Sequence, residues 1–407
     1  MKERTLSVSV SVIILTLALI IGAVCLPAPA AQAKDNITIG FSMALTGKYS
    51  PNAAGQMEAY QLWEELVNKK GGLYIKKYGK KLPVKLVYYD DKSSADTAVR
   101  IYEKLLSVDK VDLVLSPCTT VIHFAIAPLA AKYKVPIVGS TAASMKLRKI
   151  KNPYFWFVSN AMPDRQMRAL VDLLKHLKIK DVAVIYAQEL FPREQLEYLE
   201  PYLKEGGFNV LLNKDYPVGE KDLTTLLTEI KGKKPEAVIA LCYPGGSFTV
   251  TAQAQEVGLN PKFLFELIGP AVPVFGPKFG KATEGITMMG EWSIHVTWQG
   301  AKEYLEGYRA KFNKNPDVCN SIDGYESCQV LEQAIEKTAS LDREKIRDYI
   351  ANNEFSTIVG PVSFTGSENR KTSSKILQWQ NGEIDIVWPL HDATAKILYP
   401  KPPWPKK

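Results

Sequence analysis

Short apolar runs alternate with amphipathic stretches along nearly the whole sequence. Runs rich in Val and Ile, such as residues 181–186, predict buried strands, whereas residues 96–108 carry apolar side chains at every third or fourth position and predict a helix. Where strands alternate with helices, right-handed crossovers lay the strands parallel in a sheet that the helices cover. The chain is therefore predicted to be an α/β protein.

The alternation occurs in two series, and a different pattern follows them. The first series predicts strands at residues 37–43, 82–89, 111–115 and 135–139, and helices at 55–67, 96–108 and 121–133. The second predicts helices at 162–177, 194–205, 221–230 and 248–257, and strands at 181–186, 208–212, 237–241 and 263–267. The last part predicts helices at 301–312, 321–337 and 342–351, and strands at 362–364, 375–380 and 384–388. Two series without a low-complexity linker predict two lobes joined by short, ordered crossings.

Residues 1–33 have the features of a secretory signal peptide. Basic residues precede an apolar run, which is followed by two alanines at the A-x-A spacing: Lys2 and Arg4, residues 8–26, and Ala31 and Ala33. Signal peptidase accepts small residues at this spacing, so we expect cleavage after Ala33 and export across the inner membrane. The mature protein is then periplasmic or otherwise extracytoplasmic.

Two other interpretations of the N-terminus remain open. Cys25 could be the acceptor of a lipoprotein signal, although Val24 stands where such a signal has a small residue. The apolar run also approaches the length of a membrane span, so it could be an uncleaved anchor. Free export is the interpretation that the alanine spacing favours.

Charge and composition exclude several classes of protein. The formal net charge is +8 over 407 residues, and the densest basic stretch after the signal is residues 76–81. This density is too low for a nucleic-acid-binding surface. Four cysteines follow the signal, and the four histidines are isolated, so no spacing of metal ligands appears. We therefore predict buried free thiols and no metal or cofactor.

No pattern in the sequence indicates catalysis. The chain lacks a G-x-S-x-G motif, a Walker loop and a G-x-G-x-x-G motif after a predicted strand. Cys118 and His123 could be imagined as a nucleophile and its base, but His123 lies inside the first turn of the predicted helix and points away from its start. We therefore expect a binding protein rather than an enzyme.

The informative residues lie at the carboxyl ends of predicted strands, where open parallel sheets bind their ligands. Thr119 and Thr120 end the third strand and begin a helix, so hydroxyls and free N–H groups could bind a carboxylate together. Plain capping of the helix explains this pair equally well. The next strand ends in the hydroxyl-rich loop 139–144, which includes Thr141 and Ser144. In the second series, residues 186–191 and 242–245 offer aromatic walls instead.

Several of these segments together resemble one family. The marks are residues 40–47 after the first strand, residues 89–91 after the second, residues 117–120, residues 135–138 and residues 359–361. The chain is similar to substrate-binding proteins of ABC transporters of the branched-chain amino acid class, which have the type I periplasmic binding protein fold. The resemblance implies two Rossmann-like lobes with parallel sheets that close on a ligand about three hinge crossings.

The resemblance also implies domain boundaries. The crossings fall near Phe157, near Met288 and near Gly360. The first lobe is then expected to comprise residues 34–156 and 289–357, and the second residues 157–288 and 358–392, with an extended C-terminal tail at 393–407.

Carried over to this sequence, the family's ligand-binding positions fall on ten residues. The carboxylate contact falls on Thr119 with its neighbours, the polar loop follows the fourth strand, and aromatic walls come from both lobes. The residues are Thr119, Cys118, Thr120, Thr141, Ala143, Ser144, Phe191, Tyr243, Glu266 and Tyr49.

The sequence departs from the family's pattern at two positions. Ala143 stands where a threonine is common, and Leu267 stands where an acid pairs with the ligand's ammonium group, with Glu266 one residue earlier. Both departures affect the ammonium contact. The partner of Cys118 in some relatives is also absent, so Cys118 should be free.

The expected function is capture of a small carboxylate-bearing ligand, most simply a branched-chain or other hydrophobic amino acid, and its delivery to the membrane permease of an ABC importer. An aromatic acid, urea or a short amide is the alternative ligand. Sensing for a signalling receptor is the alternative role, and it would need a separate signalling partner. We expect a monomer with no nucleic-acid partner.

Overall fold

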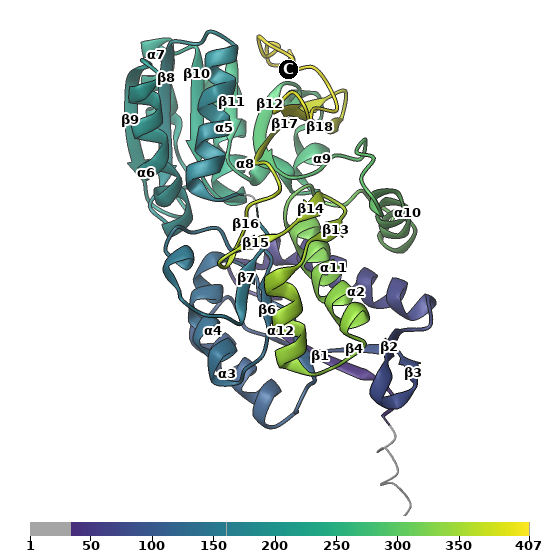
Figure 1. Ribbon diagram of the computed structural model, residues 1–407. Coiled ribbons are helices and arrows are strands. Elements are labelled where there is room, and N and C mark those ends of the chain that lie inside the picture. Colours follow the sequence, from purple (N-terminus) through teal and green to yellow (C-terminus); the bar gives the residue numbers. More distant parts are fainter. Residues whose placement is uncertain (1–33, 160, 407) are drawn as a thin grey trace, which may run out of the picture.

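The computed structural model describes residues 34–159 and 161–406. It has two lobes, one above the other in Figure 1, with the start of the described chain on the lower lobe and its end on the upper lobe. The predicted signal peptide and the alternatives for the N-terminus lie outside the described residues. Within those residues, no helix combines the length and apolar character needed to cross a membrane.

The first lobe contains two small sheets. One is a parallel sheet of order β4–β1–β5, and the other has the order β15–β16–β7–β6. Their strands are β1 (Ile37–Met43), β4 (Val84–Asp90), β5 (Leu113–Val114), β6 (Ile137–Gly139), β7 (Phe155–Phe157), β15 (Phe364–Thr365) and β16 (Glu368–Asn369). Two hairpins accompany them, β2 (Leu73–Ile75) with β3 (Lys80–Leu82) and β13 (Phe355–Thr357) with β14 (Gly360–Val362).

Six α-helices pack in the described part of this lobe. They are α2 (Ser50–Lys69), α3 (Ala95–Ser107), α4 (Thr120–Lys132), α10 (Ala301–Phe312), α11 (Asn320–Thr338) and α12 (Arg343–Asn352). Helix α3 shows why the periodicity predicted these elements: Ala98, Ile101 and Leu105 are buried on one face, and Ser94 caps its start by accepting a hydrogen bond from Thr97 N. Helix α2 begins five residues before the prediction, because Pro51 fits the first turn of a helix.

The second lobe is built on one seven-stranded sheet of order β18–β17–β12–β11–β10–β8–β9. The strands β9, β8, β10, β11 and β12 are parallel neighbours, whereas β17 and β18 are antiparallel. Their bounds are β8 (Asp181–Ala187), β9 (Asn209–Tyr216), β10 (Ala237–Leu241), β11 (Phe263–Glu266), β12 (Ile286–Gly290), β17 (Lys375–Gln380) and β18 (Glu383–Trp388). The helices are α5 (Pro163–His176), α6 (Leu190–Glu205), α7 (Thr224–Lys233), α8 (Pro244–Val257) and α9 (Phe275–Phe279). The predicted α/β class with mainly parallel sheets is confirmed.

Strand pairing locates the three crossings between the lobes. The first follows β7, after Phe157, and the second follows β12, after Gly290. The third follows β16. Glu368 pairs with Phe157 in the first lobe, so the chain crosses between Asn369 and Lys375. Arg148 holds the buried carboxylate of Glu368 in the first lobe at 2.6 Å.

The chain after β18 continues along the second lobe without a helix or strand in its described part. Lys401 N donates a hydrogen bond to Lys262 O at 2.7 Å, and Trp404 Nε1 donates one to Leu259 O at 2.7 Å. The extended tail is therefore docked on the lobe.

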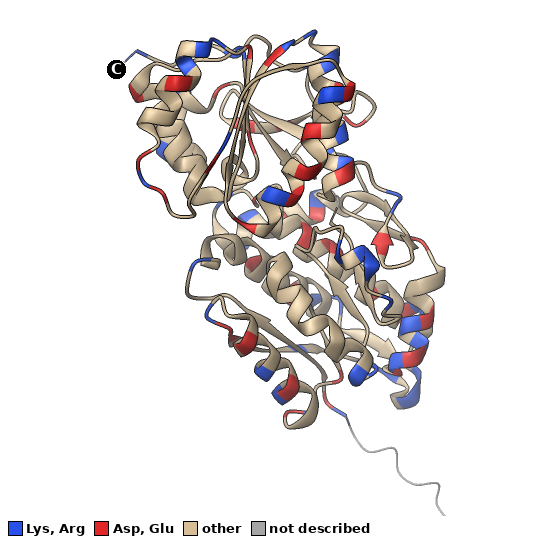
Figure 2. Cartoon of the chain, turned by 90° about the vertical axis from the view of Figure 1, so that its left-hand side faces the viewer, with Lys and Arg blue, Asp and Glu red and all other residues tan. Residues whose placement is uncertain are grey.

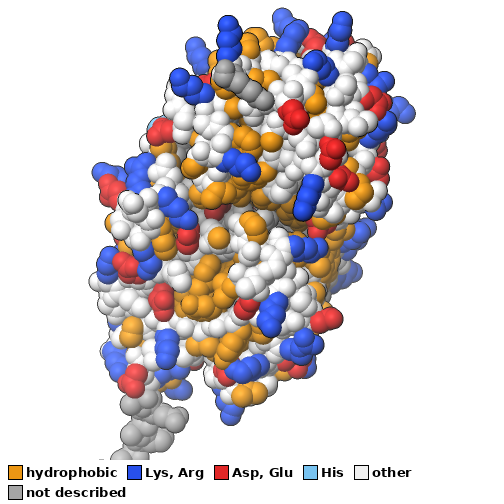
Figure 3. Space-filling model, turned by 180° about the vertical axis from the view of Figure 1, so that it is seen from behind, with side chains coloured by type: hydrophobic (Ala, Val, Ile, Leu, Met, Phe, Trp, Pro, Cys, Tyr) orange, Lys and Arg blue, Asp and Glu red, His pale blue; other side chains and the backbone are white. Residues whose placement is uncertain are grey.

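Charged side chains are mixed on both lobes. Figure 2 shows basic and acidic residues next to each other on the helices, and on the face shown in Figure 3 they surround a middle region where hydrophobic side chains gather. Neither view shows a face of one charge.

Candidate functional site

A narrow cavity lies between the lobes, where strand ends of both lobes and two helix starts converge. Its volume is about 30 Å³. The first lobe lines it with the starts of α4 and α11 and with the loop after β6, the second lobe with loops after its strands. The lining residues are Asn52, Cys118, Thr119, Thr120, Thr141, Ala143, Ser159, Ala161, Phe191, Tyr243, Ile268, Met289, Cys319, Asn320 and Asp323.

Thr119 has an unusual backbone conformation at the start of α4. Its φ is 70° and its ψ 148°, a region that β-branched residues rarely adopt. Thr119 N donates a hydrogen bond to Thr141 Oγ1 at 2.9 Å, which connects the two loops. Strained residues of this kind persist where the surrounding structure holds them, and they cluster at binding sites.

The hydroxyl of Thr119 does not cap the helix. The Thr119 side chain accepts no hydrogen bond from the first-turn N–H groups, and Thr119 Oγ1 has no hydrogen-bond partner among the described residues although Thr119 is only 4% exposed. An unpartnered buried hydroxyl beside free N–H groups can bind an anion. Plain capping by Thr119, the simpler interpretation of the sequence, is therefore wrong.

Thr120 and Ala143 hold the two polar loops together. Ala143 N donates a hydrogen bond to Thr120 Oγ1 at 3.2 Å. With the contact between Thr119 and Thr141, this bond fixes the loop after β6 against the start of α4. Both loops therefore present a preformed surface to the cavity.

Three aromatic rings from the two lobes meet above the cavity. The ring centroid of Tyr243 lies 6.0 Å from that of Phe191 and 6.3 Å from that of Tyr49. Tyr49 comes from the first lobe, and its hydroxyl donates to Glu189 Oε1 of the second lobe at 3.4 Å. Rings at this spacing stabilise the contact between the lobes.

A wider cavity lies outside these rings. It has a volume of about 330 Å³ and shares Asn52 and Tyr243 with the narrow cavity. Tyr49, Tyr216 and Pro244 contribute apolar surface to it. The two cavities together form a cleft with a small inner part and a larger, mainly apolar outer part, at whose rim Lys48, Glu189 and Lys221 add charge.

Two of the ten predicted residues do not line the narrow cavity or the wider one. Ser144 is buried, and its hydroxyl accepts a hydrogen bond from Lys146 N at 3.2 Å. Glu266 lies inside the second lobe, where Thr251 Oγ1 donates to its carboxylate at 2.6 Å. Burial raises the pKa of Glu266 to about 8. Glu266 ends β11 with its side chain toward α8, so the sequence-based placement of this acid beside the ligand is not what the structure has.

Several lining residues were not predicted from the sequence. The start of α11 contributes Cys319, Asn320 and Asp323, the first crossing contributes Ser159, and β12 contributes Met289. No strand precedes α11 directly, so the rule that ligands bind at strand ends gave no signal for it. Burial and neighbouring carboxylates hold the pKa of Asp323 well above its usual range.

Cys118 and His123 do not form a nucleophile and base. Burial raises the pKa of the Cys118 thiol to about 12 and lowers the pKa of His123 to about 4. His123 Nδ1 lies 2.8 Å from Thr119 O, so this ring nitrogen donates to the backbone. A thiol with this pKa is not a nucleophile near neutral pH. All four described cysteines are buried free thiols.

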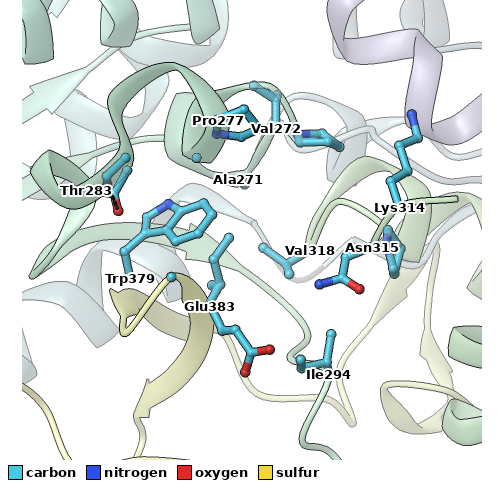
Figure 4. Close-up of a pocket in the computed structure, with 16 residues that line it drawn as sticks. Ala271, Val272, Pro277, Thr283, Ile294, Lys314, Asn315, Val318, Trp379 and Glu383 are labelled. Atoms are coloured by element: carbon cyan, nitrogen blue, oxygen red, sulfur yellow. Dashed lines mark hydrogen bonds between the residues drawn. The ribbon is translucent and has the colours of Figure 1, made fainter. Parts of the chain in front are cut away.

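A third cavity of about 420 Å³ lies between the β17–β18 hairpin, the segment around α9 and the loop before α11 (Figure 4). Its polar side chains already have partners. Trp379 Nε1 donates to Pro270 O at 2.9 Å, Lys314 pairs with Glu58 at 2.7 Å, and Asn315 accepts from Arg309 at 2.8 Å. The narrow cavity, where Thr119 Oγ1 lacks a partner among the described residues, therefore offers a polar ligand a free hydrogen-bonding group that the third cavity does not, despite its smaller volume.

Comparisons with known proteins agree with this geometry. The family described as periplasmic binding protein matches residues 36–383. Leu/Ile/Val-binding protein homolog 7 of Brucella suis biovar 1 is 21% identical over 393 residues, 92% of this chain and 96% of that protein.

Solved structures share the fold. A branched-chain amino acid transporter substrate-binding protein from Streptococcus pneumoniae, in complex with isoleucine, superposes with a TM-score of 0.75 at 21% identity and covers 90% of this chain and 100% of its own. A solute-binding protein from R. palustris, in complex with benzoate, superposes with a TM-score of 0.74 at 16% identity. It covers 89% of this chain and 98% of its own. Both place the chain in the same α/β fold.

Proposed function

Because the chain belongs to the periplasmic binding protein family, we propose that it captures a small carboxylate-bearing solute outside the cytoplasm and delivers it to the permease of an ABC importer. The ligand lies between the two lobes, with its carboxylate at the start of α4. The proposal covers hydrophobic amino acids and aromatic acids, which share this group.

The main support for the proposal comes from the polar groups without partners at the start of α4. Thr119 is held in a strained conformation, its buried hydroxyl lacks a partner within the described chain, and no side chain caps the adjacent N–H groups. A carboxylate would accept hydrogen bonds from the hydroxyl and from these N–H groups, and the positive end of the helix dipole would favour its charge.

The ligands named for two structural neighbours support the same class. Isoleucine and benzoate differ in size, shape and charge, but both carry a carboxylate. An uncharged amide or urea would leave the anion-binding groups of α4 with a weaker partner. We therefore favour carboxylates over these neutral ligands.

The two-lobe design supports the proposed delivery to a permease. Three crossings join the lobes, and a ligand bound between them holds them together, so a partner can distinguish the loaded protein by its shape. The predicted signal peptide, which would place the protein outside the cytoplasm, is consistent with this role, as is a monomer.

A thermal-shift screen tests the proposal. The mature protein is melted with amino acids, aromatic carboxylic acids, simple amides and urea. A ligand present at 100 times its dissociation constant stabilises a protein by about 2.7 kcal/mol, which is a clear shift. We expect carboxylates among the stabilising compounds. Stabilisation by amides or urea alone, or by none of the compounds, would contradict the proposed ligand class.

A further inference from the structure

Glu194 is a buried acid at a contact between the lobes, outside the ligand cleft. It lies in the second turn of α6 and is only 2% exposed, although it lines neither cavity of the cleft. The loop after β6 in the first lobe lies against it. Lys146 Nζ is 3.8 Å from Glu194 Oε1, and the hydroxyl of Ser144 also stabilises the charged carboxylate. The first lobe therefore covers a carboxyl group of the second lobe.

The partners of this carboxylate do not match its burial. Glu194 Oε2 accepts no hydrogen bond from any described residue. The side chain of Lys146 is 60% exposed, so water screens its attraction to Glu194 Oε1. Removing a carboxylate from water without strong partners disfavours its charged form. In the arrangement of the lobes that the structure has, Glu194 is therefore easier to protonate than an exposed glutamate.

The other charges near Glu194 do not compensate for its burial. Glu197, one turn further along α6, adds a like charge. Arg148 and Asp164 approach the same part of the helix, but they pair with each other at 3.1 Å. Among the described residues, Lys146 is the cation that acts on Glu194. Burial raises the pKa of Glu194 in spite of this cation.

Opening of the lobes changes these surroundings. Glu194 and Lys146 belong to different lobes, so rotation about the crossings separates α6 from the loop after β6 and returns the carboxyl group to water. There its charged form is hydrated like that of an ordinary glutamate. Closing removes the carboxyl group from water again and favours its protonated form. A proton taken up on closing shifts the equilibrium toward the closed arrangement as pH falls.

We propose that Glu194 is a positioning residue for closure, which binds a proton as the lobes close, so that closure and ligand capture are favoured as pH falls. It acts through the contact between the lobes and does not touch the ligand. The contribution to closure is complete at low pH, where Glu194 is protonated in both arrangements, and is lost as pH rises. The effect on capture rests on the function proposed above, whereas the effect on closure needs no ligand.

Small-angle scattering of the mature chain without ligand, at pH 5 and pH 7.5, tests the effect on closure. The wild-type chain should have a larger radius of gyration at pH 7.5. Glu194→Gln imitates the protonated acid, so this variant should be as compact at pH 7.5 as the wild type is at pH 5. A variant that fails to fold would be larger, so a compact radius cannot result from loss of the fold.

Two further variants show whether Glu194 is the group that responds. Glu332 is a largely buried acid of the first lobe whose pKa is also raised by burial, and its carboxylate accepts from Trp63 Nε1 at 2.7 Å. Because this contact lies within one lobe, Glu332→Gln should keep the wild-type change. Lys146→Met removes the cation that stabilises charged Glu194, so it should enlarge the change. A wild-type radius equal at the two pH values, or a Glu194→Gln variant that expands like the wild type, would overturn the inference.

Calorimetric titration with L-isoleucine and with benzoate at the same two pH values tests the effect on capture. For a compound that binds, the wild-type dissociation constant should rise by more than about twofold from pH 5 to pH 7.5, outside the scatter of a neutral change. One proton limits the rise to about tenfold per pH unit. Glu194→Gln should lose this rise. Binding by the wild type that is equally tight at both pH values would overturn the inference and leave the proposed function standing. A radius that depends on pH while neither compound binds would support the inference on closure and count against the proposed function.

Discussion

Lys48 Nζ lies 3.0 Å from Glu189 Oε1, an ion pair that connects the first lobe to the second at the mouth of the cleft. Lys48 is in the loop after β1, and Glu189 is the residue immediately before α6. Tyr49 donates to the same carboxylate oxygen at 3.4 Å. Opening the cleft would break both contacts, so this pair favours the arrangement in which the lobes touch.

Replacing Glu189 with Gln should make the closed arrangement less favourable. A partly exposed ion pair contributes about 0.2–1 kcal/mol, so ligand affinity should fall by roughly 1.4- to 5-fold. Small-angle scattering without ligand should give a larger radius of gyration for Glu189→Gln. The control is Glu229→Gln, whose partner Lys214 lies 2.7 Å away within the second lobe. If Glu229→Gln changed the ligand affinity and the radius of gyration as much as Glu189→Gln does, a role of Glu189 in closure would be contradicted.

Thr119→Ala should weaken ligand binding by roughly 10- to 150-fold, because it removes a hydrogen bond to a charged group. Stability should hardly change, since Thr119 Oγ1 has no partner within the described chain. Thr119→Ser keeps the hydroxyl and should retain most of the affinity. Calorimetric titration of the two variants with one stabilising carboxylate checks this. An affinity for Thr119→Ala within about twofold of wild type would exclude the hydroxyl as a ligand contact.

Thr119→Gly should be more stable than Thr119→Ala by about 1 kcal/mol. The φ of 70° strains any residue with a Cβ, and glycine removes that strain. Urea denaturation of the two variants measures the difference. In the interior of α3 alanine should be more stabilising than glycine, so Ala98→Gly should lower the free energy of unfolding by about 1 kcal/mol. A Thr119→Gly variant less stable than Thr119→Ala would show that the strain is small.

Glu266 should make stability fall as pH rises from about 5 to 8. Its pKa is about 8 in the folded chain, above the ordinary value of about 4.3, so the folded state keeps a proton that the unfolded state has lost. Each pH unit between the two pKa values lowers the free energy of unfolding by about 1.4 kcal/mol. The total loss is therefore at most about 5 kcal/mol. Glu266→Gln should therefore gain stability relative to wild type as pH rises.

Urea denaturation of both proteins at pH 5 and pH 7.5 checks this. The range ends below pH 8 because burial also lowers the pKa of Lys401 to about 8, and loss of its proton would add an opposite trend. A difference between the two proteins that does not depend on pH would contradict the raised pKa of Glu266.

The exported protein should begin at Lys34 and carry no lipid. The prediction rests on the spacing of Ala31 and Ala33, which lies outside the described residues. Lys34 itself pairs with Asp112 at 2.9 Å. Intact-mass measurement of the secreted chain checks it, and a mass corresponding to an acylated N-terminus at Cys25 would contradict it.

Periodicity along the sequence predicted the order of strands and helices. The predicted bounds of β1 and α10 agree with the structure, and most other elements differ by a few residues. Periodicity succeeds here because the alternation of buried and exposed side chains is a local property of a strand or a helix. That Thr119, Thr141 and Tyr243 lie at one cavity agrees with the rule that ligands bind at the carboxyl ends of parallel strands, since each of them follows a strand.

Which acid lines the narrow cavity could not be predicted locally, because it depends on how the two lobes pack. Glu266 follows a strand and Asp323 does not, yet Asp323 lines the cavity and Glu266 is bonded to Thr251 inside the second lobe. The third crossing was likewise decided by the pairing of Glu368 with Phe157. These outcomes depend on contacts between segments far apart in the chain. The packing of the lobes creates those contacts, and local periodicity carries no information about them.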